Sequence, residues 1–365
     1  MDEATALGLR MTSLLLRGGG PASAVAVASV ASVVEWFGAM QAQEVNSALW
    51  SLGVRLPGAT LSDVEAALER REAIRTWPMR GTVHWVPPAD ARWMLELMGA
   101  RALAGVEKRR ATLGLDEKTA EAGVELLATA LSGGKRLTRA ECLAVLTAGG
   151  VAVTGQRGYH LLWFAAQRAV TAIAPHVGKE QTFVLLDEWV PESRRPSREE
   201  ALGLIALRYF RSHGPTTRKD LAGWTGLTMA DVKTGIAVAG PALAAVEVGG
   251  VEMFAAAEVL DAGAGDGWLA LPGFDEYLLG YKDRSMMADA DQLAAIIPGG
   301  NGVFQSTIVR GGRVVATWKR VLGRKGVTVT VQPLIKFTSR DRHNVAAALQ
   351  PYADYLGLPL TVKNP

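Results

Sequence analysis

One order of elements recurs along this chain and constrains its fold more than any other feature: helical segments followed by two short β-rich runs around a turn. In the clearest occurrence, helices are predicted over residues 198–212, 217–223 and 229–239, and strands over 244–248 and 251–255. The Gly249-Gly250 pair between the two runs is a strong signal for a two-residue hairpin. This part of the sequence therefore predicts a small module of three helices and a hairpin.

The same plan is predicted twice more, nearer the N-terminus. The first occurrence has helices over 5–17, 29–37, 44–52 and 62–71 and strands over 74–77 and 81–86; the second has helices over 121–131, from 138 onward and over 158–168, and strands over 170–174 and 182–186. Ser62 with Glu65 and Thr138 with Glu141 have the spacing of capping boxes, which fix helix starts. Helices followed by a hairpin are typical of the winged helix, a helix-turn-helix variant that usually recognises a groove of duplex DNA.

The last hundred residues have a different pattern. β-rich runs are predicted over 268–271, 302–309, 313–320, 327–331 and on to Phe337, with a helix over 343–356. Gly311-Gly312 would join two of these runs as a tight hairpin. We therefore predict an α+β fold with three tandem winged-helix modules and a C-terminal β-barrel-like domain, divided into residues 1–95, 96–190, 197–260 and 265–365.

Composition and motifs exclude several classes of function. The chain has 365 residues and one cysteine, so it has neither a disulfide framework nor a cysteine-based zinc site. The five histidines lack metal-ligand spacing, and neither a P-loop nor a dinucleotide motif is complete. We expect no metal and no cofactor. No apolar stretch is long enough for a membrane span and the first residues lack a signal peptide, so a cytoplasmic, nucleoid-associated protein is expected.

Positive charge is concentrated near the C-terminus. The net charge is only +3, but residues 301–340 contain no Asp or Glu and carry these basic residues: Arg310, Arg313, Lys319, Arg320, Arg324, Lys325, Lys336 and Arg340. An uncompensated group of cations attracts polyanions such as DNA. A solvated strand face is the alternative interpretation.

The segment from Met40 to Trp50 contains two glutamines that a helix would separate. Gln41 and Gln43 would point about 200° apart on an α-helix, because successive residues turn by about 100°. Gly38 breaks the preceding helix, so an extended or turned Gln41–Gln43 segment is plausible and would bring the two carboxamides together. From the residues alone, two surface glutamines that cap the next helix are the favoured interpretation.

Four blocks of sequence resemble the AlkZ/YcaQ-like winged-helix DNA glycosylases and occur in the order of that family. They cover residues 40–56 with the Gln-x-Gln motif, 74–90 (IRTWPMRGTVHWVPPAD), 271–285 (LPGFDEYLLGYKDRS) and 302–320. The resemblance implies three winged helices and a C-terminal barrel. It also implies a monofunctional DNA glycosylase in which Gln41 and Gln43 are catalytic. The two-glutamine form of the motif implies bulky or crosslinking N7-alkylguanine adducts as substrates.

Two glutamines can suffice for such a substrate. A glutamine is a poor base, but it can donate and accept hydrogen bonds and so hold a water in line with C1′. An N7-alkylguanine is already cationic and leaves as a neutral base without a general acid. The expected partner is double-stranded DNA that contains alkylated guanine, bound by a monomer with no membrane contact. The residues that we expect to bind DNA are Arg80, His84, Arg310, Arg313, Lys319 and Arg320.

Alternatives stay open for several of these residues and for the function itself. His84 could instead be a buried structural histidine, and the Arg310–Arg313 hairpin an ordinary solvated turn. Asp275 and Glu276 could support the catalytic residues without being catalytic themselves, but a packing or capping role is the favoured interpretation. The alternative function is a non-catalytic winged-helix protein such as a transcription regulator, which would prefer one DNA sequence. A self-resistance or repair role would follow from the substrate.

Overall fold

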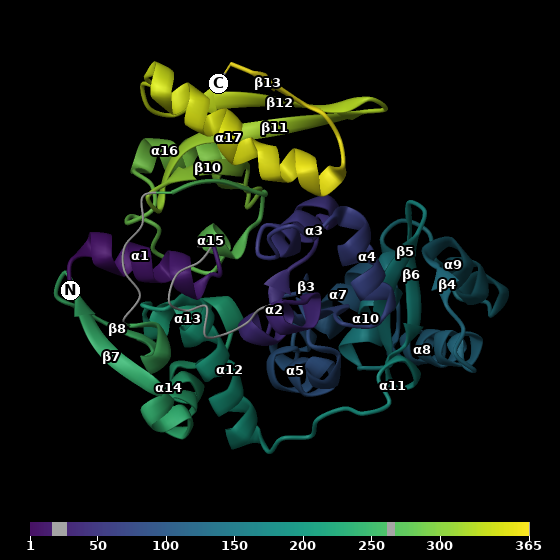
Figure 1. Cartoon of the computed structure of the whole chain (residues 1–365). Helices are drawn as coiled ribbons and strands as arrows, with labels where there is room; N and C mark the ends of the chain where they lie inside the picture. The colour runs from purple at the N-terminus through teal and green to yellow at the C-terminus, as the bar shows by residue number, and fades with distance from the viewer. Residues whose placement is uncertain (17–27, 261–266, 365) are drawn as a thin grey trace. The chain divides into compact units, whose positions relative to one another are not determined.

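The computed structural model describes residues 1–16, 28–260 and 267–364 and has an α+β fold (Figure 1). The chain forms two compact units. The first unit combines Met1–Ala66 with Leu202–Pro365, and the second contains Ala67–Ala201. The first unit is therefore discontinuous in sequence, and the second is inserted into it.

The N-terminal part of the first unit has three helices around the glutamine segment. They are α1 (Glu3–Ser13), α2 (Val30–Phe37) and α3 (Val45–Gly53), with the short strand β1 (Met40–Gln41) between the last two. Ser29 and Ser32 form a capping box that starts α2. Gly38 ends it with a φ of 76°, a conformation that favours glycine.

The next helix, α4 (Leu61–Glu69), begins differently from the prediction. The predicted capping pair, Ser62 and Glu65, is wrong. Thr60 and Asp63 make the reciprocal bonds instead: the Thr60 N–H donates to the Asp63 carboxylate at 2.8 Å, and the Asp63 N–H donates to Thr60 Oγ1 at 3.2 Å. Both pairs have the spacing of a capping box, so spacing alone could not select between them.

The helix–helix–helix–hairpin order predicted near residue 200 is present in the structure. Its elements are α12 (Arg198–His213), α13 (Arg218–Thr225), α14 (Met229–Ala239), β7 (Leu243–Val248) and β8 (Val251–Ala256). The turn at Gly249 and Gly250 has φ values of 55° and 80°, as a type I′ hairpin turn requires. Thr228 starts α14 as the N-cap of a capping box with Asp231.

The C-terminal strands form an open sheet in the order β13-β12-β11-β10-β9. The strands are β9 (Trp268–Leu271), β10 (Ser306–Arg310), β11 (Arg313–Gly323), β12 (Gly326–Pro333) and β13 (Leu360–Lys363). Among the described residues β13 and β9 lie at opposite edges, so the predicted barrel-like closure is not confirmed. The sheet pairs β12 with β13 in parallel, and β13 was not predicted.

Three helices belong to this C-terminal part. The helices α15 (Glu276–Leu279) and α16 (Ala290–Ile296) lie in the connection from β9 to β10, and α17 (Ser339–Leu356) packs against β9. The predicted closing helix over 343–356 is thus confirmed, with an earlier start at the Thr338 cap. In Figure 1 the long ribbon of β11 and β12 projects beyond the rest of its sheet.

The second unit places the two N-terminal hairpins in one sheet. Its strands β2 (Ile74–Met79), β3 (Thr82–Val86), β4 (Leu137–Thr138), β5 (Thr171–Val177) and β6 (Glu180–Leu185) follow the order β3-β2-β5-β6-β4. Arg75 on β2 pairs with Ile173 on β5, so the hairpin predicted for the first module joins the hairpin predicted for the second.

Helices complete the second unit. They are α5 (Ala91–Met98), α6 (Ala100–Leu103), α7 (Val106–Leu113), α8 (Glu117–Leu131), α9 (Arg139–Ala148), α10 (Arg157–Gln167) and α11 (Leu186–Trp189). The predicted capping box of Thr138 and Glu141 is confirmed at the start of α9. Short 3₁₀ turns elsewhere in the chain occupy Pro88–Asp90, Gly240–Ala242, Ala257–Val259 and Pro298–Gly300.

Candidate active site

Gln41 to Gln43 are not helical, which fits the extended or turned interpretation of this segment. Gln41 ends β1, Ala42 to Glu44 are irregular, and α3 starts at Val45. Glu44 starts α3 by accepting hydrogen bonds from two backbone amides, that of Asn46 at 3.2 Å and that of Ser47 at 2.7 Å. The cap fixes the chain direction immediately after Gln43.

The two glutamines differ in exposure. Gln41 is only 9% exposed, whereas Gln43 is exposed. The Gln43 backbone N–H points to Gln41 Oε1 at 3.4 Å, so the Gln41 carboxamide turns toward the residue two positions ahead. The segment therefore combines a buried Gln41, whose carboxamide turns toward Gln43, with an exposed Gln43.

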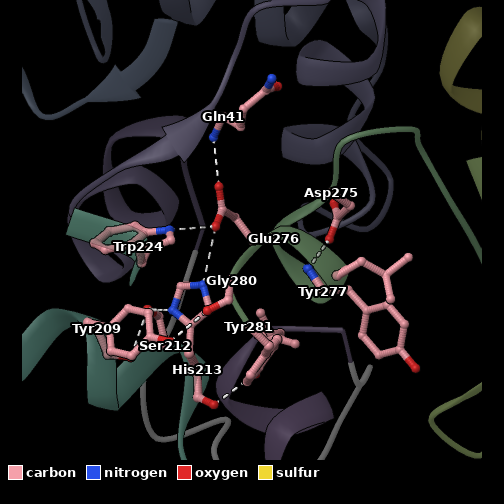
Figure 2. Close-up of polar contacts among 12 residues, drawn as sticks. Gln41, Tyr209, Ser212, His213, Trp224, Asp275, Glu276, Tyr277, Gly280 and Tyr281 are labelled. Carbon is pink, nitrogen blue, oxygen red and sulfur yellow. Dashed lines mark hydrogen bonds and ion pairs between the residues drawn. The ribbon is translucent and has the colours of Figure 1, made fainter. Parts of the chain in front are cut away.

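A buried carboxylate holds the backbone of this segment. The Gln41 N–H donates to Glu276 Oε1 at 2.7 Å, and the Gln41 side chain points away from Glu276 (Figure 2). The other oxygen, Oε2, accepts a hydrogen bond from Trp224 Nε1 at 3.0 Å and faces His213 Nε2 at 3.3 Å. A carboxylate has only acceptors, so we assign the proton of this contact to His213 Nε2.

His213 is itself held on every side. Its Nδ1 is 2.8 Å from Ser212 Oγ, and its carbonyl oxygen accepts the Tyr281 hydroxyl at 2.7 Å. The Tyr209 ring stacks on the imidazole with 4.6 Å between centroids. Burial raises the pKa of Tyr209 well above its ordinary value, so this phenol stays neutral. The imidazole thus has one orientation in which to meet Glu276.

Asp275, the neighbour of Glu276, ties the same turn to α3. Its carboxylate makes a bidentate ion pair with Arg55, with N–O distances of 2.8 and 2.9 Å. It also accepts a hydrogen bond from the Ser51 hydroxyl at 2.8 Å. It also accepts the Tyr277 backbone N–H at 2.9 Å and so caps α15. The Arg55 side chain has 0% exposure, so this is a buried ion pair with its hydrogen bonds satisfied.

One predicted DNA-binding residue, Arg320, lies beside the glutamine segment. Its Nη2 is 3.5 Å from Glu44 Oε2. Burial raises the pKa of Glu44, but hydrogen bonds from Ser47 and Asn46 and the Arg320 charge lower this pKa more, so it lies below its usual value. Lys319, the preceding residue on β11, is exposed. The basic strand therefore adjoins the glutamines.

The predicted Arg310–Arg313 hairpin forms, but its turn is packed. Arg310 is ion-paired with Asp341 at 3.2 Å and Arg313 with Asp289 at 2.6 Å, and both arginine side chains are 43% exposed. The Tyr277 hydroxyl donates to the Gly312 carbonyl, and a Cβ at Gly312 would lie 2.5 Å from Leu7 Cγ. Gly312 is thus packed while Arg310 and Gly311 are exposed, and DNA contact by these arginines stays a prediction.

The other two predicted DNA contacts lie in the second unit. Arg80 is exposed at the tip of the β2–β3 hairpin with a φ of 55°, an uncommon conformation for a residue other than glycine. His84 has 0% exposure, and its Nδ1 is 2.9 Å from the Thr82 carbonyl oxygen. This burial supports the structural interpretation of His84.

Sequence reasoning missed two features. One is the partner set of Glu276, because nothing local links residue 276 with His213 and Trp224. The other is the tip of the β11–β12 hairpin: Arg324 and Lys325 form its turn, and Val321 and Leu322 beside it are 69% and 51% exposed. The run of cations had been noted in the sequence, but the length of the projecting ribbon was not predicted.

Within the described ranges the structure holds no group of three or more His, Cys, Asp or Glu side chains arranged for a metal ion. The same residues include no helix with the length and apolar character needed to cross a membrane.

Comparison with known proteins places the chain in a family. Residues 34–355 match the family described as DNA glycosylase AlkZ-like. The interstrand DNA cross-link repair glycosylase of Streptomyces sahachiroi is 26% identical over 320 residues, which is 80% of this chain and 82% of that protein. The solved structure of the Streptomyces sahachiroi DNA glycosylase AlkZ matches the whole of both chains with a TM-score of 0.81 at 23% identity. The family match over most of its length shows that this chain belongs to the AlkZ-like family and is a DNA glycosylase.

Proposed function

We propose that this DNA glycosylase releases N7-alkylated guanine from duplex DNA, including bulky adducts and the guanine of an interstrand crosslink, and leaves an abasic site. The observation that carries the proposal is the fixed, non-helical segment of Gln41 and Gln43, in which the Gln41 carboxamide turns toward Gln43 and Gln43 is exposed. The similar Streptomyces sahachiroi protein is named as a glycosylase of interstrand cross-link repair, which supports the same class of substrate.

The chemistry of the segment suits a cationic lesion. The acidic side chains around it are occupied: Glu276 is 1% exposed, and Glu44 caps α3 and faces Arg320. No strong base is thus offered to an attacking water, but the two carboxamides can orient one. When the C1′–N9 bond of N7-alkylguanine breaks, its electron pair neutralises the positive charge of the base. The water oxygen bonds to C1′ and its proton goes to solvent.

Neutral amides restrict the range of substrates. An ordinary guanine would leave as an anion and would need a general acid, which the glutamines do not supply. We therefore expect release of cationic N7-alkylguanines and no release of undamaged bases. We assign no lysine a Schiff-base role and therefore propose hydrolysis alone, without strand cleavage by lyase chemistry.

The DNA-facing surface that we propose runs along β11 from Arg320 to the hairpin tip. Lys319, Arg324 and Lys325 are exposed cations for the phosphate backbone. Val321 and Leu322 are successive strand residues that point to opposite faces of the ribbon, and both are exposed. An apolar pair between cations on a projecting two-stranded ribbon fits a DNA groove.

The organisation that we propose around this site is modular. The order α12, α13, α14 and the β7–β8 hairpin supports a winged helix over residues 197–260. With it we propose two further winged helices, over 1–95 and 96–190, and a C-terminal domain over 265–365. We also propose that the protein is a monomer with a cytoplasmic, nucleoid-associated location. If the natural adduct comes from a DNA-alkylating natural product, the enzyme would provide self-resistance. The alternative of a non-catalytic regulator is not supported by the family match.

The proposal is tested with the full chain and a duplex that carries one N7-methylguanine or one bulky N7-guanine adduct. Abasic sites are converted to strand breaks with mild alkali and counted. We expect breaks with wild type, and loss of breaks with Gln41→Ala or Gln43→Ala while DNA binding is retained. Gln350→Ala, an exposed glutamine on α17, is the matched control. Absence of release from both lesions by wild type would refute the proposed substrate class.

A further inference from the structure

The helix α15 does not depend on the Glu276 side chain for its start. Asp275 caps α15 by accepting the Tyr277 N–H. The Glu276 side chain instead points away from α15 toward β1, where it accepts a hydrogen bond from the Gln41 N–H at 2.7 Å. Its 1% exposure means that it was removed from water, which is unfavourable for a carboxylate unless several donors replace that water.

Two side chains from another part of the chain supply those donors. Trp224 on α13 donates to Oε2 at 3.0 Å, and His213 at the end of α12 reaches the same oxygen at 3.3 Å. The three contacts fix both oxygens of the carboxylate, one toward Gln41 and one away from it (Figure 2). The position of the Gln41 backbone is thus set by α12 and α13 through Glu276.

Space is kept for this arrangement at Gly280. A Cβ at Gly280 would lie 2.1 Å from His213 Cδ2 and 2.5 Å from His213 Nε2, closer than Cβ contacts occur. Gly280 has an ordinary helical φ of −64°, so its backbone does not require glycine. Glycine is required at position 280 because a Cβ there would displace the His213 imidazole from Glu276.

The adjacent Asp275 fixes the other end of the segment. It holds Ser51 and Arg55, which lie at the end of α3 and just after it, by hydrogen bonds of 2.8 to 2.9 Å. Gln41 is therefore attached to α15 on one side of the motif, and α3 is attached to α15 on the other. Two successive carboxylates thus hold the segment that carries both glutamines.

We propose that Glu276, oriented by His213 and Trp224, is a positioning residue that acts on catalysis through Gln41. The inference rests on the proposed function, in which the Gln41 carboxamide orients the water. Glu276 is buried, and its part is to set the place of the Gln41 backbone. Losing that restraint should slow excision without weakening DNA binding, because a displacement of about 1 Å in a catalytic group can cost about 100-fold in rate.

Glu276→Gln is the informative substitution. Its carbonyl oxygen can still accept the Gln41 N–H, but its NH₂ group would then face two other donors, Trp224 Nε1–H and His213 Nε2–H. Gly280→Ala disturbs the same place without changing the carboxylate. The matched control is Asp90→Asn in the second unit: Asp90 is also fully buried, accepts a tryptophan N–H from Trp93 at 2.7 Å and is ion-paired with Arg194 at 2.8 Å.

The experiment measures single-turnover release of N7-methylguanine, the dissociation constant for the same duplex and the melting temperature. For Glu276→Gln and Gly280→Ala we expect rates lower by about 10- to 100-fold. We expect dissociation constants within about twofold of wild type and no greater loss of melting temperature than in Asp90→Asn. An unchanged rate in Glu276→Gln, or a weakened binding that explains the whole loss, would overturn the proposal.

A double variant tests whether Glu276 acts through Gln41. If it does, Glu276→Gln added to Gln41→Ala should cost less than about twofold beyond Gln41→Ala alone, because residues that act as a unit are not additive. If the two losses multiply, Glu276 acts independently and the proposal is wrong.

A readout that needs no activity separates this inference from the proposed function. Hydrogen exchange of the backbone amides of residues 40–43 is followed by mass spectrometry in wild type, Glu276→Gln and Asp90→Asn. We expect faster exchange in Glu276→Gln only. If wild type releases neither N7-methylguanine nor a bulky N7-guanine adduct, the proposed substrate class fails. Faster exchange would then still support the restraint on Gln41, and unchanged exchange would overturn it.

Discussion

Gln41 and Glu276 are separated by 235 residues of sequence and joined by a hydrogen bond of 2.7 Å from the Gln41 backbone N–H to Glu276 Oε1. The contact links the Gln-x-Gln block to the block that contains Asp275 and Glu276, two of the four blocks by which the sequence resembled its family. The role of the second block is thus physical: it forms the turn whose Glu276 binds the backbone of the glutamine segment.

The buried ion pair of Arg55 and Asp275 should dominate the stability of this turn. Arg55→Met leaves the Asp275 carboxylate buried without its cation, which is expected to lower the free energy of unfolding by about 3–5 kcal/mol. Urea unfolding of the full chain measures the loss. The matched control, Arg218→Met, breaks an exposed pair with Glu252 and should cost at most about 1 kcal/mol. Equal losses in the two variants would contradict the prediction.

Glu44 should make the stability of the first unit depend on pH. Because its pKa is lowered from 4.5 in the folded protein, its contribution is fully present above pH 4.5 and is lost as the pH falls through the lowered pKa. We therefore expect Glu44→Gln to reduce the free energy of unfolding at pH 7, and this deficit to shrink as the pH falls below 4.5. Glu125→Gln, at an exposed position on α8, is the control. A deficit of Glu44→Gln that stays constant across this range would argue against the assignment.

The tip of the β11–β12 hairpin should contribute to DNA binding through charge. Arg324→Ala with Lys325→Ala should reduce the slope of log K against log salt concentration by about 1.8, since each phosphate contact contributes about 0.9. Fluorescence anisotropy with an undamaged duplex at several salt concentrations measures the slope. Lys118→Ala with Lys135→Ala removes the same charge from exposed positions of the second unit. The same reduction in both double variants would show that the hairpin has no special role.

Cys142 should be an inert thiol in the folded protein. Its side chain is buried in α9, and burial raises its pKa to about 12, so almost no thiolate forms near neutral pH. Reaction with a thiol-specific disulfide reagent at pH 8 should be slow in buffer and fast in concentrated urea. Fast reaction of the native chain would contradict the burial.

Local features of this fold could be predicted from the sequence. Gly249-Gly250 and Gly311-Gly312 each require turns that join adjacent strands, and both hairpins are present. Gly38 predicted the end of α2, and the same glycine favoured the extended or turned interpretation of Gln41 to Gln43. Each of these inferences depends on backbone geometry within a few residues.

Features that depend on distant residues could not be predicted in this way. The pairing of β2 with β5, the parallel addition of β13 and the partners of Glu276 all join segments whose spacing in sequence carries no signal. The capping pair of α4 was missed for a different reason, because two overlapping pairs, Ser62–Glu65 and Thr60–Asp63, had the same spacing. For the candidate site, the glutamines came from the family resemblance and their support came from the structure.

The discontinuous first unit has a consequence for synthesis of the protein. Gln41 leaves the ribosome long before Glu276, and at about 5–20 residues per second the 235 residues between them take on the order of 10–50 s. During that time the glutamine segment lacks the carboxylate that restrains it, even if α2 and α3 have already formed. We expect the enzyme to acquire its competence late, when nearly the whole chain has been translated, so that fragments ending before residue 276 leave the DNA bases of the cell untouched.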